Sequence, residues 1–510
     1  MKKEVNKKVF FEILAIILIA LFCISLTPKT LQNDTFYTIK IGEHIIQNKG
    51  IDMKDPFSWH ENLSYTYPHW LYDVMIYLIY NIGGMTGIYI STCIFSLILG
   101  ITIYKVNEKL VKNKVLSFVI TIGAMYLLKG YITARAQLVT FILFELELFC
   151  IERLLDTCKK RYGIGLIIIS ILMANLHVAV WPFFFVLYLP YIAEFIIYCI
   201  EEHMAKKFGK EVKQGDKLEM QKRPGMKYLI IVMIICALTG FLTPLGTTPY
   251  TYLYKTMQGN TTQNINEHLP MTLINEENIL CALVLFLAVL IFTKTKIRLC
   301  DLFMLGGLIL LMLMTKRQST MFVLMCSVIL NRLIYGWITS QVKDFDDKVL
   351  NFAMNGFGVF MLSSVIIMFC LYFIKPKLKQ AYIDPNTYPV EMSDWILEYF
   401  EREQIDLSEV RLFNEYNYGS YLLFRGIPVF IDSRCDLYSP EYNPGVTVFD
   451  DFIASSNLND WFEMRLAKYN FTHMILYKDS KMNMIIERGN LDGYKLLKQD
   501  NNFVFYEVTR

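Results

Sequence analysis

Residues Phe10–Leu26 read FFEILAIILIALFCISL, and they follow a start, Met1–Lys8, that reads MKKEVNKK. A helix needs about 20 mostly apolar residues to cross a bilayer. No small-residue cleavage site of a signal peptide follows this run. Basic residues beside a span favour the cytoplasmic side. The stretch therefore predicts a retained membrane helix with its N-terminus in the cytoplasm.

Ten more apolar runs follow, so the chain is predicted to cross the membrane about eleven times. Its apolar fraction is 54%, above the roughly 45–50% of soluble domains. The further runs are Gly87–Val106, Val115–Lys129, Leu138–Leu155, Ile164–Leu176, Trp181–Ile200, Tyr228–Thr243, Ile279–Phe292, Leu302–Met314, Met321–Trp337 and Phe352–Ile374. The fold class is a multi-pass α-helical membrane protein with a transmembrane module over 1–375.

The charges of the connecting loops orient this module. With the N-terminus inside, the cytoplasmic connections 156–162, 201–227 and 293–298 are rich in Lys and Arg, as the positive-inside rule requires. An odd number of spans places the C-terminal region, 376–510, outside a cell membrane. The alternative is an even number of spans, with that region in the cytoplasm.

Composition argues against several classes of protein. A net charge of +3, from 50 basic and 47 acidic residues, is too small for a nucleic-acid-binding protein. Only Cys435 lies in the long polar C-terminal stretch, so no disulfide stabilises that region. The chain has no P-loop and no H-E-x-x-H or C-x-x-C motif, so no nucleotide, metal or other cofactor is expected.

The long first loop, 27–86, is predicted to lie outside. Tyr37, Ile41 and Ile45 recur at helical spacing, and 70–80 is rich in Trp and Tyr, which favour the membrane–water interface. We therefore expect two helices on the outer surface, with polar residues between them. The alternative is a plain surface loop with interfacial anchors.

Two short outer turns carry cations against the positive-inside trend. They are Arg135-Ala136-Gln137 and Lys316-Arg317-Gln318. Basic residues on the wrong side of a membrane are unfavourable without an anionic partner, and the guanidinium fork of Arg suits phosphate. Arg135, Gln137, Lys316 and Arg317 are the predicted phosphate-binding residues. The alternative is that they snorkel at helix ends.

Six of the seven histidines are also predicted to lie outside or at the outer rim. Together with nearby acids and amides they define a candidate substrate pocket: Glu43, His44, Asp55, His69, Asn175, His177, Glu267 and His268. A carboxylate could deprotonate an acceptor, while fixed cations could stabilise a departing phosphate. This combination favours a reaction on a lipid-linked phosphate ester.

Short motifs are spread over nearly the whole chain. They are Asp34, Gly42-Glu43-His44, Asp55-Pro56-Phe57-Ser58, Trp70-Leu71, Arg135-Ala136-Gln137, Asn175-Leu176-His177, 413–422 and 430–434. This set resembles the membrane glycosyltransferases of the GT-C superfamily, specifically the bacterial relatives of protein mannosyltransferases. Ala136 stands where that family has proline.

The resemblance implies an inverting hexosyltransferase that uses a polyprenyl-phosphate sugar, with Asp34 as general base. Its acceptor would be an extracytoplasmic protein, glycolipid or wall polymer. Many members have two adjacent acidic residues in the first loop, whereas this chain has Asn33-Asp34-Thr35. We therefore expect chemistry without a metal.

The C-terminal region is predicted to be an α/β domain with a mainly parallel sheet. Strands are expected at Val410–Phe413, Pro428–Ile431, His473–Tyr477 and Phe503–Val508, with helices at 393–400, capped by Ser393, and at Asn459–Lys468. Asn414, Tyr416, Asp432 and Arg434 are candidates for the acceptor side. The alternative for Asp432 and Arg434 is a structural ion pair.

Two other functions stay open. A transporter or flippase of a lipid-linked saccharide would place polar residues near the bilayer midplane, where Glu145 and Glu147 are predicted. A non-catalytic envelope assembly factor would use the C-terminal domain to bind a partner.

Overall fold

A computed structural model describes residues 2–208, 215, 217–259 and 261–509. The chain divides into two compact units. Unit 1 contains 1–28, 90–243 and 266–379, and unit 2 contains 29–89, 244–265 and 380–510. Unit 2 therefore combines the C-terminal region with most of the first loop.

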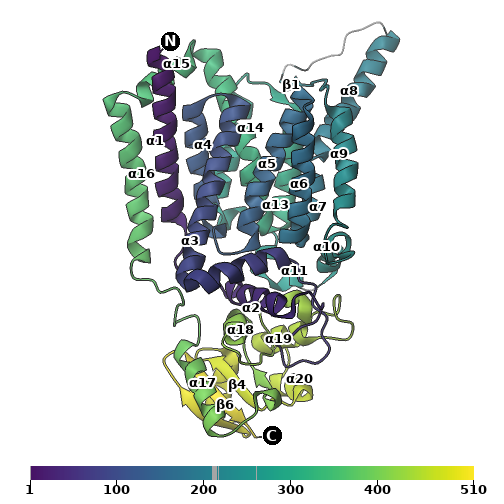
Figure 1. Cartoon of the computed structure of the whole chain (residues 1–510), viewed down its shortest axis with the longest axis vertical. Coiled ribbons are helices and arrows are strands. Elements are labelled where there is room, and N and C mark those ends of the chain that lie inside the picture. The colour runs from purple at the N-terminus through teal and green to yellow at the C-terminus, as the bar shows by residue number, and fades with distance from the viewer. Residues whose placement is uncertain (1, 209–214, 216, 260, 510) are drawn as a thin grey trace. The chain divides into compact units, whose positions relative to one another are not determined.

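Unit 1 is a bundle of helices that run side by side (Figure 1). Helix α3 (Trp70–Val111) is shared between the units, and its residues from 90 on belong to unit 1. The other described helices of unit 1 are α1 (Lys2–Leu26), α4 (Lys114–Leu127), α5 (Ala136–Thr157), α6 (Lys160–Leu176), α7 (Trp181–Val186), α8 (Leu189–Phe208), α9 (Met226–Thr239), α12 (Glu277–Phe292), α13 (Leu299–Met314), α14 (Ser319–Gln341), α15 (Phe345–Ala353) and α16 (Gly356–Lys377). Two short strands, β1 (Leu218–Glu219) and β2 (Ile297–Arg298), pair in parallel.

Seven of the eleven apolar runs of the sequence lie within one of these helices, the runs 115–129 and 228–243 extend past the ends of α4 and α9, and the runs 181–200 and 352–374 are each divided between two helices. In the described part of the chain, five helices are long and apolar enough to cross a membrane. They are Asn6–Leu26, Trp70–Val111, Val178–Phe208, Lys316–Gln341 and Gly356–Lys377. Four shorter apolar helices are Lys114–Leu127, Met226–Thr239, Glu277–Phe292 and Leu299–Met314. The number of eleven spans stays a prediction.

Two predicted runs are interrupted, and local chemistry explains each break. The chain turns between α7 and α8 beside Pro190, which lacks the backbone N–H that a continuous helix needs. Between α15 and α16, Asn355 is the N-cap, and its side chain accepts a hydrogen bond from the Gly358 amide at 2.6 Å. A new helix therefore starts there.

Unit 2 contains a small four-stranded sheet and several helices. Its described helices are α2 (Asn33–Asn48), the first part of α3, α10 (Thr248–Gln258), α11 (Thr261–Asn264), α17 (Val390–Arg402), α18 (Tyr416–Phe424), α19 (Val448–Asn457), α20 (Phe462–Leu466) and α21 (Lys481–Gly489). The strands are β3 (Leu412–Phe413), β4 (His473–Tyr477), β5 (Tyr494–Gln499) and β6 (Phe503–Val508).

The sheet has the order β3-β4-β6-β5, and only the β3–β4 pair is parallel. The prediction of a mainly parallel sheet is therefore wrong. The reason is the β5–β6 hairpin, whose turn is held by the Asp500 carboxylate, which accepts hydrogen bonds from the amides of Asn502 and Phe503. Strand β5 reads YKLLKQ and is largely exposed, so it lacks the apolar signal of a buried strand.

The other local predictions for unit 2 had mixed outcomes. Strands β4 and β6 have the predicted bounds. The stretch 428–431 is not a strand, although Val429 forms an isolated bridge with Ser58. Ser393 lies inside α17 rather than at its N-cap, and its hydroxyl donates a hydrogen bond to the Val390 carbonyl.

Candidate active site

Helix α2 packs closely against the start of α3. A Cβ atom on Gly42 would lie 2.2 Å from the Asp73 carbonyl oxygen and 2.7 Å from the Tyr77 Cβ, so only glycine allows this contact. The glycine of the Gly42-Glu43-His44 motif therefore sets the distance between α2 and the first turns of α3. The predicted helix around 37–46 is confirmed as α2, which buries Tyr37, Ile41 and Ile45.

Asp34 lies in the first turn of α2 and is partly buried. A carboxylate is stabilised at this end of a helix by the helix dipole. The neighbouring Asn33 amide donates a hydrogen bond to the Tyr416 carbonyl at 2.9 Å. The Asp34 charge also acts on His69, Tyr388 and Cys435.

His69 is the centre of a hydrogen-bonded group between α2 and α3. Its Nδ1 lies 2.7 Å from Asp73 Oδ1, and its Nε2 lies 3.1 Å from the Tyr37 hydroxyl. Burial opposes protonation of this imidazole, but the Asp73 carboxylate outweighs burial and the Asp34 charge adds to its effect. The pKa of His69 is therefore raised above its usual value of about 6.5.

A third carboxylate, Asp436, acts on the same histidine. Asp436 accepts hydrogen bonds from the Tyr252 hydroxyl at 3.1 Å and from the Thr66 hydroxyl at 3.4 Å. Burial raises the pKa of its carboxyl. We define Asp34, Asp73 and Asp436 with His69 as the acidic cluster.

Sequence reasoning did not identify Asp73, Asp436 or Tyr252 as site residues. His69 and Asp73 are four residues apart at the start of a helix, a spacing that brings side chains together. That spacing could have revealed their pairing. No local pattern indicated Tyr252, which lies 184 positions from Asp436 in the chain.

Asp55, Asp432 and Arg434 form a different kind of group, which we define as the arginine lock. Arg434 donates to Asp432 through Nε at 2.9 Å and Nη2 at 2.7 Å, and to Asp55 through Nη1 at 2.7 Å. The Asp55 and Arg434 side chains are both fully buried. The ion pair between Asp432 and Arg434, which the sequence left as an alternative, is present.

Every carboxylate oxygen of the arginine lock accepts two hydrogen bonds. The donors other than Arg434 are the Phe57 and Ser58 amides, the Ser58 hydroxyl and the Tyr438 hydroxyl. Burial opposes ionisation of Asp55, but the guanidinium outweighs it and lowers the pKa of this carboxyl. Asp55 and Arg434, candidates for the pocket and the acceptor side, thus join the first loop to the C-terminal fold.

The two remaining acceptor-side candidates are also engaged with the backbone. Asn414 is fully buried, accepts from the Phe430 amide at 2.8 Å and donates to the Ile431 carbonyl at 2.7 Å. Tyr416 donates from its hydroxyl to the Ser433 carbonyl at 3.2 Å. Gly419 allows this packing, because a Cβ there would lie 2.0 Å from the Ile431 carbonyl oxygen.

Two pocket candidates on α2, Glu43 and His44, have partners within the first loop. Glu43 pairs with Lys40 on the same helix. His44 Nε2 lies 3.4 Å from Asp52 Oδ2, and the Asn48 side-chain amide lies 3.0 Å from the same nitrogen. Unlike His69, therefore, His44 pairs with a largely exposed carboxylate.

In unit 1, two of the predicted phosphate-binding cations have carboxylate partners. Arg135 Nη1 lies 2.9 Å from Glu267 Oε1, and Lys316 Nζ lies 2.6 Å from Glu276 Oε1. Each of these two cations thus has an anionic partner within the chain. A phosphate bound at Arg135 would have to compete with Glu267.

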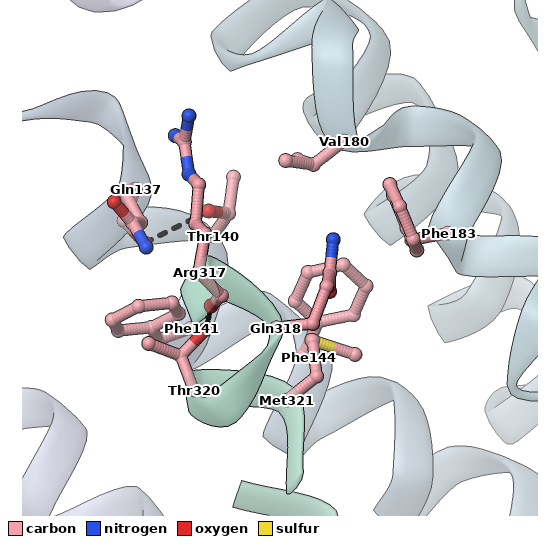
Figure 2. A pocket seen from close by; sticks show the side chains of 10 residues that line it. All are labelled: Gln137, Thr140, Phe141, Phe144, Val180, Phe183, Arg317, Gln318, Thr320 and Met321. Atoms are coloured by element: carbon pink, nitrogen blue, oxygen red, sulfur yellow. Dashed lines mark hydrogen bonds between the residues drawn. The ribbon is translucent and has the colours of Figure 1, made fainter. Parts of the chain in front are cut away.

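Arg317 and Gln137 line a pocket in unit 1 (Figure 2). Its polar residues come from three places: the start of α5, the 3₁₀ turn before α14 and the first turn of α14. Its apolar side is formed by aromatic and aliphatic residues of α5, α7, the turn before α7 and α14. The complete lining is Gln137, Thr140, Phe141, Phe144, Val180, Phe183, Arg317, Gln318, Thr320 and Met321. The pocket therefore offers a guanidinium and amides beside an apolar wall.

Glu267 and His268 lie in the connection that precedes α12. Burial opposes ionisation of Glu267, but Arg135 and Arg317 outweigh it and lower the pKa of this carboxyl. Burial, together with Arg317, lowers the pKa of His268 to about 4. His268 is therefore a neutral imidazole at physiological pH, able to accept or donate one hydrogen bond.

Asn175 and His177 lie at the end of α6 and are buried. The Asn175 amide donates to the Ile171 carbonyl at 2.8 Å and to the Leu242 carbonyl at 3.0 Å. This amide therefore links α6 to the turn after α9. Across the described residues, no three or more His, Cys, Asp or Glu side chains are grouped so that they could hold a metal ion.

No family model and no curated protein matches this chain. A solved structure does: the Archaeoglobus fulgidus oligosaccharyltransferase, tethered through a disulfide bond to an acceptor peptide with the NVT sequon. The TM-score is 0.55 at 11% identity, over 97% of this chain and 74% of that one. The chain has a GT-C fold. A second structure of that enzyme, in complex with Zn and sulfate, has a TM-score of 0.48 at 11% identity, over 97% of this chain and 73% of that one.

The matched region covers 97% of this chain and therefore includes residues of both units. The fold that the sequence motifs resembled is thereby confirmed, although at 11% identity the likeness concerns architecture alone.

Proposed function

We propose that this chain is a membrane glycosyltransferase that transfers a sugar from a polyprenyl-phosphate donor to an extracytoplasmic acceptor. The observation that carries the proposal is the GT-C fold over 97% of the chain. The acidic cluster and the pocket around Arg317 supply residues of the kinds that such a transfer needs.

In the proposed reaction, Asp34 is the general base. Its carboxylate takes the proton from the acceptor group, and the freed electron pair attacks the anomeric carbon of the sugar. The bond from that carbon to the phosphate oxygen breaks, and polyprenyl phosphate leaves with the bonding electrons. One displacement from the opposite face inverts the anomeric configuration.

His69 lies within the electrostatic reach of Asp34. The Asp73 carboxylate raises the pKa of His69, so the imidazole keeps its proton to higher pH than an unperturbed histidine does. Asp73 keeps His69 oriented through its Nδ1. We therefore assign His69 and Asp73 as positioning residues for Asp34.

The Arg317 pocket suits the phosphate end of the donor. Its guanidinium can bind two phosphate oxygens and stabilise the charge that develops as the phosphate leaves. The aromatic wall of Phe141, Phe144 and Phe183 suits the first isoprene units of the lipid. Arg135 can add a second cation when it releases Glu267.

The oligosaccharyltransferase with this fold was crystallised with an acceptor peptide. By analogy, a peptide is the first class of acceptor to test here, followed by glycolipids and wall polymers. The sugar is to be identified by the same assay.

The test is release of polyprenyl phosphate by the full chain reconstituted in lipid. Wild type and Asp34→Asn are given a panel of polyprenyl-phosphate sugars with peptide or envelope acceptors, and the lipids are followed by mass spectrometry. We expect Asp34→Asn to lower turnover about a hundred- to ten-thousand-fold. Glu61→Gln, which neutralises an exposed carboxylate in the same loop, should retain wild-type turnover.

Two results would contradict the proposal. Folded wild type that releases no lipid phosphate with any donor and acceptor would remove the transferase activity. Release that is equal in wild type and Asp34→Asn would keep the transferase but remove Asp34 as its base.

A further inference from the structure

Helix α5 carries three buried glutamates, Glu145, Glu147 and Glu152. Glu145 and Glu147 lie at the middle of this 22-residue helix, roughly 15 Å from either end. Glu145 and Glu152 are seven residues apart and so share a face of the helix. Their surroundings nevertheless differ completely.

Glu152 is surrounded by cations. Arg298 donates to both of its oxygens at 2.8 and 3.0 Å, Arg223 lies at 3.1 Å and Arg332 at 3.2 Å. The Tyr191 hydroxyl donates a further hydrogen bond at 2.8 Å. A buried carboxylate with this many donors is stable in its ionised form.

Glu145 and Glu147 have none of these donors. Both side chains are fully buried, and among the described residues none donates a hydrogen bond to any of their four carboxylate oxygens. The described groups that interact electrostatically with Glu147 include Tyr188, Cys150 and Cys236, none of which can carry a positive charge. An ionised carboxylate in such surroundings is strongly unfavourable.

We propose that Glu145 and Glu147 are two separate intramembrane proton-binding sites, at which the bundle holds two neutral carboxylic acids while Glu152 on the same helix stays ionised. The ligand is the proton, and each glutamate binds one. Neutral acids in an apolar bundle are also the form that reacts with a hydrophobic carbodiimide, so each site doubles as a site of covalent modification. This inference does not depend on the proposed transferase activity.

In the modification, the carboxylic proton moves to a nitrogen of the carbodiimide, and the carboxylate oxygen then bonds to its central carbon. The adduct can rearrange to a stable N-acylurea without a further reactant. Glu152 has no proton to give and should not react. One tryptic peptide, Ala136–Arg153, contains all three glutamates, so each is the control for the others.

The experiment treats the full chain in lipid vesicles with dicyclohexylcarbodiimide and locates the adducts by fragmenting this peptide. We expect labelling of Glu145 or Glu147 to exceed that of Glu152 at least about tenfold, because a central charge is disfavoured by more than one decade. Equal labelling of all three, or labelling of Glu152 alone, would overturn the proposal.

Infrared spectroscopy decides the case in which the reagent fails to reach the helix. Wild type should show the carbonyl band of a protonated carboxylic acid, and the intensity of that band should fall in the double variant Glu145→Gln and Glu147→Gln. A wild type without this band would overturn the proposal. Both substitutions replace a neutral acid by a neutral amide of the same shape, so Tm should be retained, whereas Glu152→Gln should lower Tm by roughly 10 °C.

Discussion

The acidic cluster and the arginine lock use the same residue types within unit 2, but they are built differently. In the arginine lock, one guanidinium lies between two carboxylates, and each carboxylate oxygen accepts two hydrogen bonds. In the acidic cluster, three carboxylates act on one imidazole. The first arrangement is closed and electrostatically satisfied, so it suits a structural role.

The acidic cluster places three carboxyl groups around one imidazole, and burial raises the pKa of one of them, Asp436. Titratable groups perturbed by one another and by burial are typical of sites that move protons. A buried Asp or Arg in a motif therefore indicates function only when its neighbours do not already satisfy its charge and all of its hydrogen bonds. Asp432 and Arg434 resembled site residues in the sequence, but each already has its charge paired within the arginine lock.

The largest expected effect on stability is in the arginine lock. Arg434→Met removes the guanidinium and leaves two fully buried carboxylates without it, so the free energy of unfolding should fall by about 3–5 kcal/mol. Thermal unfolding of the purified chain measures this. Arg434→Lys keeps the positive charge but not the planar guanidinium that binds both carboxylates, so it should lower the free energy of unfolding by less than Arg434→Met does. A Met variant with wild-type Tm would show that the lock is not structural.

Substitutions of the two neighbouring cations in unit 1 should separate a ligand site from an ion pair. Arg317→Gln removes the guanidinium that lines the pocket and should raise the KM for the lipid donor about ten- to a hundredfold. Lys316→Gln removes a cation already paired with Glu276 and should change KM less. Donor titrations of the two variants provide the measurement, and a larger effect at Lys316 would reverse the assignment.

Gly42→Ala tests whether the acidic cluster depends on the close contact of α2 and α3. The added methyl would overlap the Asp73 carbonyl, so α2 must move away at a cost of about 1–3 kcal/mol. Both Tm and turnover should fall. The control is Gly306→Ala, since a Cβ there meets no atom within 4 Å. Equal Tm values for the two variants would contradict the contact.

The smallest expected effect concerns the pH dependence of turnover. Asp73 raises the pKa of His69, so the imidazolium persists above its usual pKa of about 6.5 and is lost as pH rises through the raised value. Turnover should therefore fall at alkaline pH, and Asp73→Asn should move that fall to lower pH. An unchanged profile would remove His69 from its positioning role.

The sequence predicted much of the local structure and little of the pairing. Hydropathy located every helix-forming apolar run, and the Tyr37, Ile41 and Ile45 spacing predicted α2, because both signals depend on neighbouring residues. Strand β5 was missed, since an exposed strand carries no apolar pattern.

The candidate site was harder to predict, because its partners are distant in the chain. Arg135 finds Glu267, 132 positions away, and Arg434 finds Asp55, 379 positions away. No local motif encodes such pairs. Motif resemblance singled out Asp34 and the gathering of outer histidines singled out His69, while Asp73 and Asp436 became visible only through the contacts that the fold creates.

The most direct test of this account compares Asp34→Asn with Arg434→Lys in one preparation, by measuring turnover and Tm for each. We predict that Asp34→Asn retains the wild-type Tm and loses about a hundred- to ten-thousand-fold in release of polyprenyl phosphate. Arg434→Lys should lower Tm, while its remaining folded fraction stays active. Loss of turnover without loss of Tm in the Arg434 variant, together with an active Asp34 variant, would contradict the account.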